Sequence, residues 1–275
     1  MSTWIVTGIS NGLGKSIAQA AMDAGHYVHG CARNADAVAS FNQSSQQNGK
    51  AVVLDVTDLE AVTAWVQGIS DNGPIDVLVN NAGAGTAGSV EETHMEVVRE
   101  IMEVNFFAVA HLTQLMLPVM RKQGAGRIIQ ISSHGGIKAF PGFGIYNASK
   151  FALEGYSEAL AAEVAPLGIH VSLVEPGPFR TQFAGSSLKL SERSVDAYAR
   201  TAHAFQDKLS GVHGQQEGDP DKAAAAILDL VNEPNPSLRL PLGTVPLKTI
   251  QMKLDSVAAD LERNREVAAG AVFVE

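Results

Sequence analysis

Strand-like and helix-like segments alternate along almost the whole chain, and this alternation limits the fold more than any other feature. Apolar, β-branched runs predict strands at Trp4–Thr7, Tyr27–Ala32, Ala51–Leu54, Asp76–Val79, Arg127–Ile131, His170–Val174 and Leu238–Leu240. Helical patterns lie between them, at Gly14–Ala24, Asp58–Ser70, His94–Arg121, Ser149–Ala165 and Asp221–Val231, and a last one covers Val245–Val267. Alternating β and α units predict a doubly wound parallel sheet of six to seven strands in one α/β domain over residues 1–275.

The first of these units contains a glycine-rich turn. The strand Thr3–Thr7 is followed by Gly8-Ile9-Ser10-Asn11-Gly12-Leu13-Gly14 and then by a helical run. Glycines allow a tight turn and a close backbone approach, and a helix N-terminus presents free N–H groups to a pyrophosphate. The strand and helix on either side therefore favour a dinucleotide site over an ordinary turn.

Tyr146 and Lys150 form a second motif, four residues apart, so that they share one face if a helix begins near Asn147. A neighbouring ammonium favours the phenolate, so Lys150 is expected to lower the pKa of Tyr146 from about 10. Such a Tyr can exchange a proton with an alcohol or ketone oxygen. Ser133, thirteen residues upstream, offers a hydroxyl to the same oxygen.

Together these motifs resemble those of the short-chain dehydrogenase/reductase family. The resemblance covers Thr3 to about Thr181 and adds Asn80-Asn81-Ala82-Gly83, Asn105 and Pro176-Gly177 to the glycine turn and the Tyr–Lys pair. It implies a Rossmann-type fold and an NADP(H)-dependent oxidoreductase that interconverts a secondary alcohol and a ketone or aldehyde. It also implies four catalytic residues: Tyr146 as acid and base, Lys150 on Tyr146 and the nicotinamide ribose, Ser133 on the substrate oxygen, and Asn105 kinking its helix and holding a relay water.

The same resemblance implies the cofactor site. Its residues are Gly8, Ser10, Asn11, Gly12, Leu13, Gly14, Arg33, Asp55, Val56, Asn81, Ala82, Gly83, Tyr146, Lys150, Pro176, Gly177 and Thr181. The end of the second strand, where an acidic residue would bind the ribose hydroxyls, carries Ala32 and then Arg33. A guanidinium can hold a 2′-phosphate, so NADP(H) is expected in preference to NAD(H).

Composition excludes several other classes of function. The net charge of −9 argues against nucleic acid and anionic membranes, so a small alcohol or carbonyl compound is the expected partner. The single cysteine, Cys31, fits a reducing compartment, and neither a signal peptide nor an 18-residue apolar span is present, which predicts a cytoplasmic protein. The eight histidines show no metal-ligand spacing, so no metal is expected.

The substrate is not readable from the sequence. Residues 183–217 are interpreted as a lid over a partly apolar pocket, and residues 238–275 as a C-terminal extension resembling the branch of 17β-hydroxysteroid and retinol dehydrogenases. A catalytically silent NADP-binding redox sensor and an S-adenosylmethionine-binding methyltransferase are the alternatives. The family resemblance also implies a homodimer through His94–Arg121 and Ser149–Ala165, unless the extension covers that face and leaves a monomer.

Overall fold

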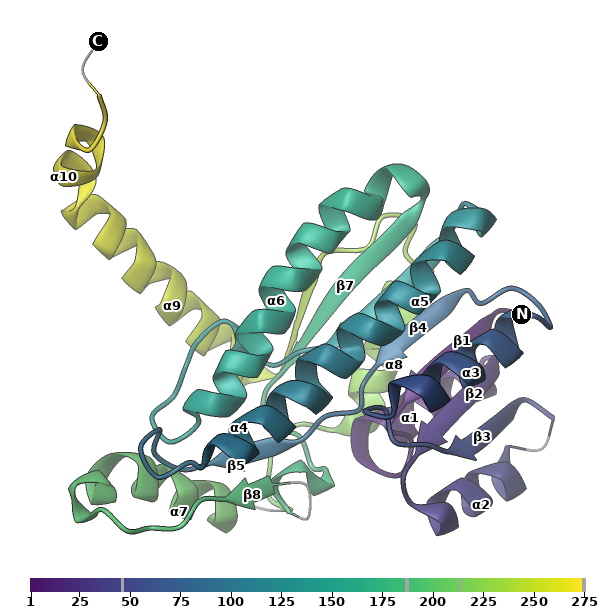
Figure 1. Cartoon of the computed structure of the whole chain (residues 1–275), viewed down its shortest axis with the longest axis horizontal. Helices are drawn as coiled ribbons and strands as arrows, with labels where there is room; N and C mark the ends of the chain where they lie inside the picture. Colours follow the sequence, from purple (N-terminus) through teal and green to yellow (C-terminus); the bar gives the residue numbers. More distant parts are fainter. Residues whose placement is uncertain (46, 186–187, 213, 274–275) are drawn as a thin grey trace.

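A computed structural model describes residues 1–45, 47–185, 188–212 and 214–273, and its centre is a parallel β-sheet (Figure 1). The sheet has seven strands in the order β3-β2-β1-β4-β6-β7-β9. They are β1 (Thr3–Thr7), β2 (Tyr27–Ala32), β3 (Gly49–Val53), β4 (Val77–Asn80), β6 (Gly126–Ile131), β7 (Ile169–Pro176) and β9 (Arg239–Leu242). The strand order reverses between β1 and β4, so the predicted doubly wound α/β fold is confirmed.

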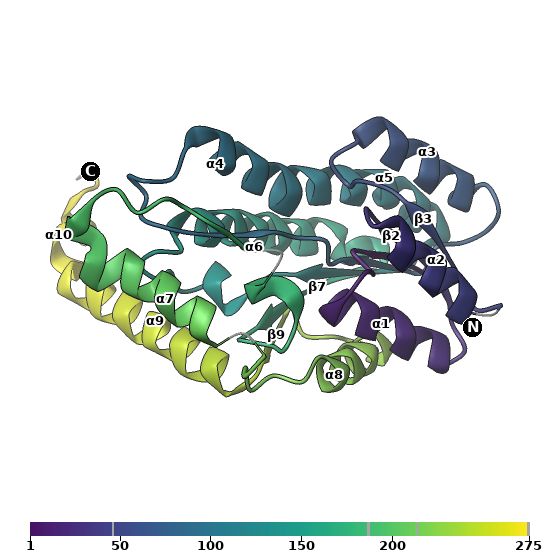
Figure 2. The same ribbon diagram turned by 90° about the horizontal axis from the view of Figure 1, so that it is seen from below.

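Helices cover both faces of this sheet, as the view from below shows (Figure 2). One face carries α1 (Gly12–Asp23), α2 (Ala35–Ser44) and α8 (Pro220–Asn232). The other carries α3 (Leu59–Ser70), α4 (Met95–Met102), α5 (Ala108–Gln123) and α6 (Gly144–Val164). Three further α-helices lie later in the chain: α7 (Ala204–Gly211) after β7, and α9 (Thr244–Arg263) and α10 (Arg265–Gly270) after β9.

Each face of the sheet has its own apolar core, because the side chains of a strand alternate between the two faces. On β1, Trp4 and Val6 belong to the core under α1 and α8, whereas Ile5 belongs to the core under α3, α5 and α6. All three side chains are at most 1% exposed. Burial of both faces explains the continuous apolar runs that marked the strands in the sequence.

N-cap side chains determine where several helices begin. The Asp58 carboxylate accepts a hydrogen bond from the Ala61 N–H at 3.0 Å and so begins α3, and the Asp219 carboxylate does the same for α8 ahead of Pro220. Asn34 begins α2 in the same way, by accepting from the Ala37 N–H at 2.8 Å. The sequence analysis missed α2, whose apolar positions are few.

The helix expected over His94–Arg121 is not uniform. Between α4 and α5 lies a five-residue π-helical turn, Glu103–Phe107, with Asn105 inside it. The Asn105 side chain binds the backbone of Ala84, which draws this turn out of regular geometry. The expected kink at Asn105 is therefore present, as a π-helical turn.

A small second sheet was also missed. Strand β5 (Gly85–Ala87) pairs in parallel with β8 (Leu188–Leu190) and so ties the segment after β7 to the loop after β4. These strands have three residues each, too short for a periodic signal. The segment 183–217, interpreted as a lid, contains β8 and α7, and its residues 186, 187 and 213 lie outside the described residues, as do 274 and 275 of the extension.

Candidate active site

The β1–α1 turn has the backbone that a bound phosphate group requires. Gly8 and Gly12 have positive φ values of 74° and 55°, which side chains rarely allow. A Cβ atom on Gly14 would lie 2.2 Å from Asn81 Nδ2 and 2.4 Å from the Gly8 carbonyl oxygen. Asn81 in turn donates to the carbonyl oxygens of Thr7 at 2.8 Å and Gly8 at 3.1 Å. Glycine at these positions and Asn81 therefore fix the turn jointly.

The N-terminus of α1 differs from those of α2, α3 and α8. Its N-cap residue, Asn11, makes no capping hydrogen bond, and the first turn holds no acidic residue, whereas the other three have both. The Asn11 amide instead donates to Ser10 Oγ at 3.2 Å. Free N–H groups and the positive end of the helix dipole remain available to an anion.

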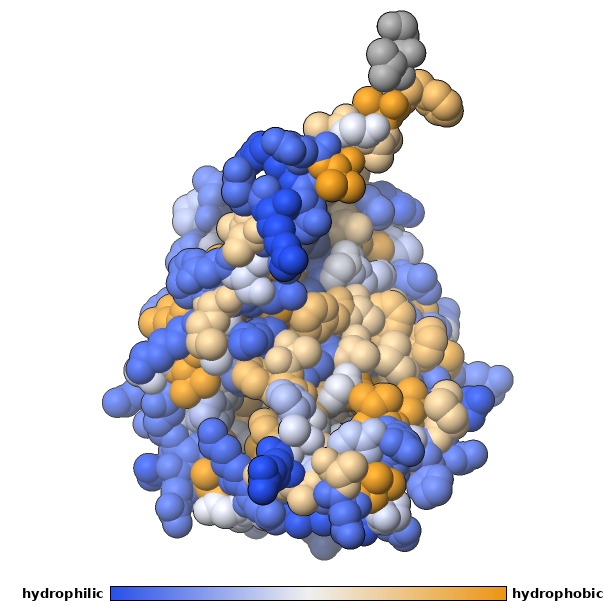
Figure 3. Space-filling view, turned by 90° about the vertical axis from the view of Figure 1, so that its left-hand side faces the viewer, coloured by the Kyte–Doolittle hydropathy of each residue, from blue (hydrophilic) through white to orange (hydrophobic). Residues whose placement is uncertain are grey.

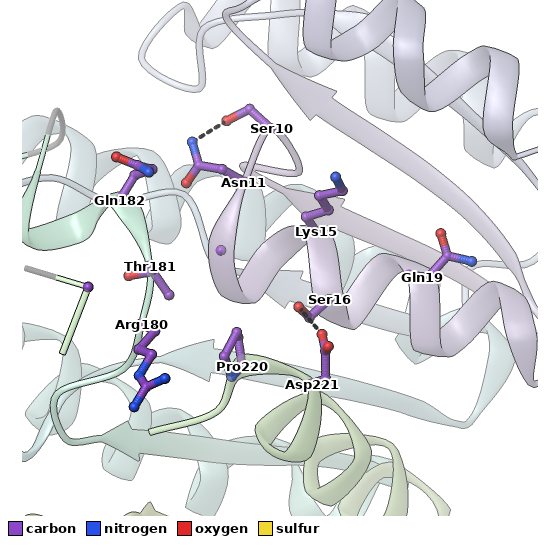
Figure 4. Close-up of a pocket in the computed structure, with 12 residues that line it drawn as sticks. Ser10, Asn11, Lys15, Ser16, Gln19, Arg180, Thr181, Gln182, Pro220 and Asp221 are labelled. Atoms are coloured by element: carbon purple, nitrogen blue, oxygen red, sulfur yellow. Dashed lines mark hydrogen bonds between the residues drawn. The ribbon is translucent and has the colours of Figure 1, made fainter. Parts of the chain in front are cut away.

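A cavity of about 550 Å³ lies at this end of α1 (Figure 4). Ser10, Asn11, Gly12 and Thr181, all predicted as cofactor residues, line it. Two cations that the sequence analysis missed, Lys15 and Arg180, also line it. Lys15 directly follows the last glycine of the turn and Arg180 directly precedes Thr181, so both could have been found as neighbours of predicted residues.

The other predicted cofactor residues surround the same ends of the strands. Ala82 donates its N–H to Thr7 Oγ1 at 3.0 Å, and the Gly177 N–H donates to Leu242 on β9 at 2.9 Å. Thr181 approaches the glycine turn so closely that a Cβ atom on Gly12 would lie 2.9 Å from its Cβ. Leu13 packs at the edge of the α1 core, and Val56 is half-buried after β3. Glycine backbone, free N–H groups and nearby cations thus fit a dinucleotide pyrophosphate.

Arg33 stands where the adenosine end of such a dinucleotide would lie. Its side chain is 76% exposed, and Nη1 lies 3.9 Å from the Asp55 carboxylate at the end of β3. Asp55 is itself held by Thr57, whose N–H and hydroxyl both donate to Oδ1. An exposed ion pair at this distance is weak, so Arg33 is free to turn to a phosphate.

Tyr146, Lys150 and Ser133 lie together beside the cofactor turns. Tyr146 is in the first turn of α6, which begins at Gly144 rather than near Asn147. Its ring and the Ser133 hydroxyl both border Gly135, where a Cβ atom would lie 3.5 Å from Tyr146 Cε1 and 3.2 Å from Ser133 Oγ. The Lys150 ammonium lies 5.9 Å from the centre of the Tyr146 ring and donates to the Ile131 carbonyl oxygen at 2.8 Å. Gly83 is in the loop after β4. A Cβ atom on Gly83 would lie 3.8 Å from Lys150 Nζ, so the loop passes next to the ammonium.

The expected effect of Lys150 on Tyr146 is absent from this structure. Burial raises the pKa of Tyr146 to about 12, although the hydrogen bond from Ser133 acts in the opposite direction. Burial also lowers the pKa of Lys150 to about 8, opposed by the nearby Glu154 carboxylate. Desolvation, which penalises both charged forms, is the largest cause of both pKa shifts. The Tyr146 phenol therefore carries its proton in this structure, because its pKa lies above the ordinary value.

Asn105 holds the loop that faces these residues. Its Oδ1 accepts from the Ala84 N–H and its Nδ2 donates to the Ala84 carbonyl and to Ser149 Oγ, each at 2.9 Å. It is fully buried. Because Ser149 directly precedes Lys150, Asn105 links the loop after β4 to the turn of α6 that carries Lys150.

A second polar cluster lies behind the first one and was not predicted. Glu154 follows Lys150 by one helical turn, and Glu175 is the next-to-last residue of β7; the two are 4% and 0% exposed. Arg239 on β9 places its Nε 3.3 Å from Glu154 and 3.4 Å from Glu175. Burial and the neighbouring Glu154 raise the pKa of Glu175 to about 7, and burial also raises the pKa of Glu154.

Aromatic rings enclose Tyr146 on the substrate side. The ring of Phe143 stacks on it at 4.3 Å, and Phe183 lies 5.3 Å away, measured between ring centres. His134 lies at the edge of this cluster, 5.1 Å from Phe140, and bonds Thr249 of α9 at 3.0 Å; burial lowers its pKa to about 4. His134 is thus a neutral side chain between the pocket and α9.

Contacts with Glu92, away from Tyr146, hold the segment after β7 in place. The Glu92 carboxylate accepts hydrogen bonds from Ser89, from the N–H groups of Ser194 and Val195, and contacts His203 at 2.9 Å. These hydrogen bonds, with that from Ser89 the strongest, hold the pKa of Glu92 at about 2. Nothing in the local sequence marked Glu92, because its partners other than Ser89 lie about 100 residues further along the chain.

A glycine cradle at a helix N-terminus and a buried Ser–Tyr–Lys set on one doubly wound sheet define a nucleotide-dependent oxidoreductase. Residues 2–190 match the short chain dehydrogenase family. The chain therefore belongs to the short-chain dehydrogenase/reductase family, as the resemblance predicted.

Individual proteins agree with this assignment. A short-chain dehydrogenase from Streptomyces avermitilis has a similar structure, with a TM-score of 0.93, 41% identity and 98% of each chain covered. The 3-ketodihydrosphingosine reductase of Bacteroides thetaiotaomicron is 40% identical over 249 residues, which are 87% of each chain. The actinorhodin polyketide ketoreductase, solved with NADPH, has a TM-score of 0.75 and 27% identity over 88% of this chain and 95% of its own. Nicotinamide cofactors thus bind to this fold in a related protein.

No group of three or more His, Cys, Asp or Glu side chains is placed to hold a metal ion among the residues that the structure describes. None of their helices combines the length and apolar character needed to cross a membrane.

Proposed function

We propose that this protein is an NADP(H)-dependent oxidoreductase that interconverts a secondary alcohol and a ketone or aldehyde, with Tyr146 as general acid and base. The observation that carries the proposal is the burial of Tyr146, Ser133 and Lys150 together, next to the glycine loop at Gly83. The bound nicotinamide supplies the hydride, and the protein supplies the proton and the orientation of the substrate.

Each of the four proposed catalytic residues has its own role. Ser133 and Tyr146 both border Gly135, so a carbonyl oxygen that enters between their hydroxyls would receive hydrogen bonds from both. In reduction the neutral Tyr146 phenol gives its proton to that oxygen. Lys150, held by the Ile131 carbonyl, lies close enough to stabilise the resulting phenolate and has donors left for a ribose hydroxyl. Asn105 and its loop keep this turn of α6 in place.

The cofactor proposed is NADP(H), with NAD(H) as the alternative. Arg33 is exposed after β2 and only loosely paired, and its neighbour Ala32 carries no carboxylate to repel a 2′-phosphate. Lys15 and Arg180 add positive charge at the pyrophosphate cavity. The NADPH of the ketoreductase described above supports the same choice.

The substrate proposed is a carbonyl compound with an apolar body. Phe143 and Phe183 enclose Tyr146, and Phe140 and Phe205 extend this aromatic cluster. The relative named for 3-ketodihydrosphingosine reduction supports a ketone, and reduction, as the starting point for assays. Residues 183–217 act as the lid and residues 238–275 as an extension of the single domain; the buried, unpaired Cys31 suits a reducing, cytoplasmic setting.

Consumption of NADPH in the presence of a panel of apolar ketones and aldehydes tests the proposal. The parent chain is expected to turn over at least one compound, and Tyr146→Phe is expected to bind NADPH while losing turnover. Tyr156→Phe is the matched control, since Tyr156 is on the same helix and packs on Phe106 instead of the site. Turnover of Tyr146→Phe within tenfold of the parent would remove Tyr146 as the acid.

The same assay separates the two alternatives. A redox sensor would bind NADPH without consuming it with any carbonyl compound, and a buried Ser–Tyr–Lys set would have no task in it. A methyltransferase would bind S-adenosylmethionine in place of NADPH. No contact of the described residues favours either alternative.

A further inference from the structure

Helix α9 (Thr244–Arg263) leaves the body of the molecule. It begins against the site, where Pro246 is buried and Thr249 contacts His134, and then projects outward (Figure 1). From Leu254 to Arg263 every residue is exposed. Figure 3 shows the C-terminal segment standing out from the body with strongly apolar side chains on it. Isolated helical segments of this length are marginal in water, which points to a partner.

Five apolar side chains of α9 form one stripe. They are Leu247, Ile250, Leu254, Val257 and Leu261. Their spacing alternates between three and four residues, which is the heptad seam by which two helices pack together. Leu247 is 64% exposed, Leu254 55%, Val257 40% and Leu261 68%, so the seam has no partner among the described residues of this chain.

The charges on this segment distinguish between kinds of partner. Residues 244–270 carry four basic side chains and four acidic ones, so the segment is neutral while the chain has a net charge of −9. A neutral helix on an acidic protein gains nothing from an anionic lipid surface. Lys253 and Asp260 are seven residues apart and flank the stripe on the same side, as g positions of a coiled coil do. This pattern complements a second copy of itself.

We propose that α9 is a dimerisation helix that pairs antiparallel with α9 of a second copy of this chain. Antiparallel pairing places Leu254 opposite Val257 of the second copy and Ile250 opposite its Leu261. Lys253 then lies beside Asp260 of the second copy, and two such pairs form by symmetry. The two bodies lie at opposite ends of the helix pair and so avoid each other, whereas a parallel pair would bring them together at one end.

This interface differs from the one that the family resemblance implied. Helices α5 and α6 expose Phe107, beside α5, and Phe151. Several of their other apolar positions pack against the subunit's own core while staying partly exposed, namely Leu115, Leu117, Val119 and Tyr156. The extension does not cover these helices, since α9 points away from them (Figure 1). The contact proposed here therefore needs no surface of α5 or α6.

Sedimentation of the full chain at micromolar concentration tests the proposal. The parent is expected at twice the 28.9 kDa chain mass, and L254D/V257D at the mass of one chain. Met252→Asp is the matched control: Met252 is 59% exposed on the same helix but about 200° around it from Leu254, so this variant stays dimeric. Circular dichroism and NADPH binding confirm that each variant is folded.

A charge exchange tests the register. Lys253→Asp weakens the dimer by placing two acidic groups together, and the double variant K253D/D260K restores it. A monomeric parent, a dimer that survives L254D/V257D, or a parent that sediments with neutral phosphatidylcholine vesicles would each overturn the proposal.

Discussion

Lys150 and Glu154 are one turn apart on the same helix and both are buried, yet they belong to regions with opposite roles. Lys150 faces the cofactor loops, and its ammonium has a single carbonyl partner. Glu154 faces the interior, where it shares Arg239 with Glu175. In the proposed mechanism the open region, made of the glycine turn, Arg33, Tyr146 and Lys150, keeps its polar groups for cofactor and substrate. In the closed region the charges of Glu154, Glu175 and Arg239 pair with one another. Burial of a charged group is therefore not by itself a sign of catalysis.

The largest expected effect is on Lys150. Lys150→Ala should lower kcat by about 10²–10⁴-fold, since the phenolate of Tyr146 loses its neighbouring cation. It should also weaken NADPH binding, because the ribose contact is lost, and steady-state kinetics with a fluorescence titration measure both. Unchanged NADPH affinity would contradict the ribose contact and leave Lys150 a role only on Tyr146.

The next largest expected effect is on the stability of the closed region. Arg239→Met should lower the free energy of unfolding by about 2–3 kcal/mol, because it leaves two buried carboxyl groups without a cation; the value is reduced because Arg239 is 34% exposed. Urea denaturation measures it. Arg265→Met, which removes an exposed pair with Glu262, is the control and should change stability little. Equal effects of the two variants would show that Arg239 is not structural.

Cofactor preference tests the open region without affecting folding. The double variant A32D/R33A removes the phosphate partner and adds a carboxylate, so the preference should shift from NADPH toward NADH by roughly 1.5–3 kcal/mol. Titration of each variant with both cofactors measures the shift, and urea denaturation checks that stability is unchanged. A parent with equal affinity for the two cofactors would contradict the role of Arg33.

The smallest effect concerns pH. Glu175 has a pKa of about 7 in the folded state and an ordinary one when unfolded, so the folded state holds the extra proton between these values. The contribution of Glu175 to stability is therefore fully present below its unfolded pKa and is lost as the pH rises to about 7. The lowered pKa of His134 acts in the opposite direction in both proteins, so the comparison with Glu175→Gln isolates Glu175: the variant should lack about 1–2 kcal/mol of destabilisation over this range. Urea denaturation from about pH 5 to 7.5 measures it, below the range in which Lys150 loses its proton.

Glu158→Gln is the control for this experiment. Glu158 binds the same Arg239 but is 63% exposed, so the variant should keep the parent's pH dependence. If Glu175→Gln has the same slope as the parent, Glu175 is ionised in the folded protein, and the closed region is an ordinary charge pair.

The two regions also differ in how far the sequence predicted them. The glycine turn and the Tyr146–Lys150 pair are contiguous motifs whose spacing is preserved in any helix or turn, and the structure brings them to one edge of the sheet. Glu154, Glu175 and Arg239 come from three separate elements, and only the sheet order brings them together. The pKa of Tyr146 was predicted in the wrong direction because it depends on desolvation, which a motif does not contain.

A titration of the parent chain with NADPH, followed by the fluorescence of the nucleotide, tests the central claim most directly. The account predicts saturable binding at one site per chain, displaced by NADP⁺ at lower concentration than by NAD⁺. It also predicts that Gly14→Ala abolishes this binding, since its Cβ atom would lie 2.4 Å from the Gly8 carbonyl oxygen and distort the phosphate turn. Absence of saturable NADPH binding by the folded parent would contradict the account.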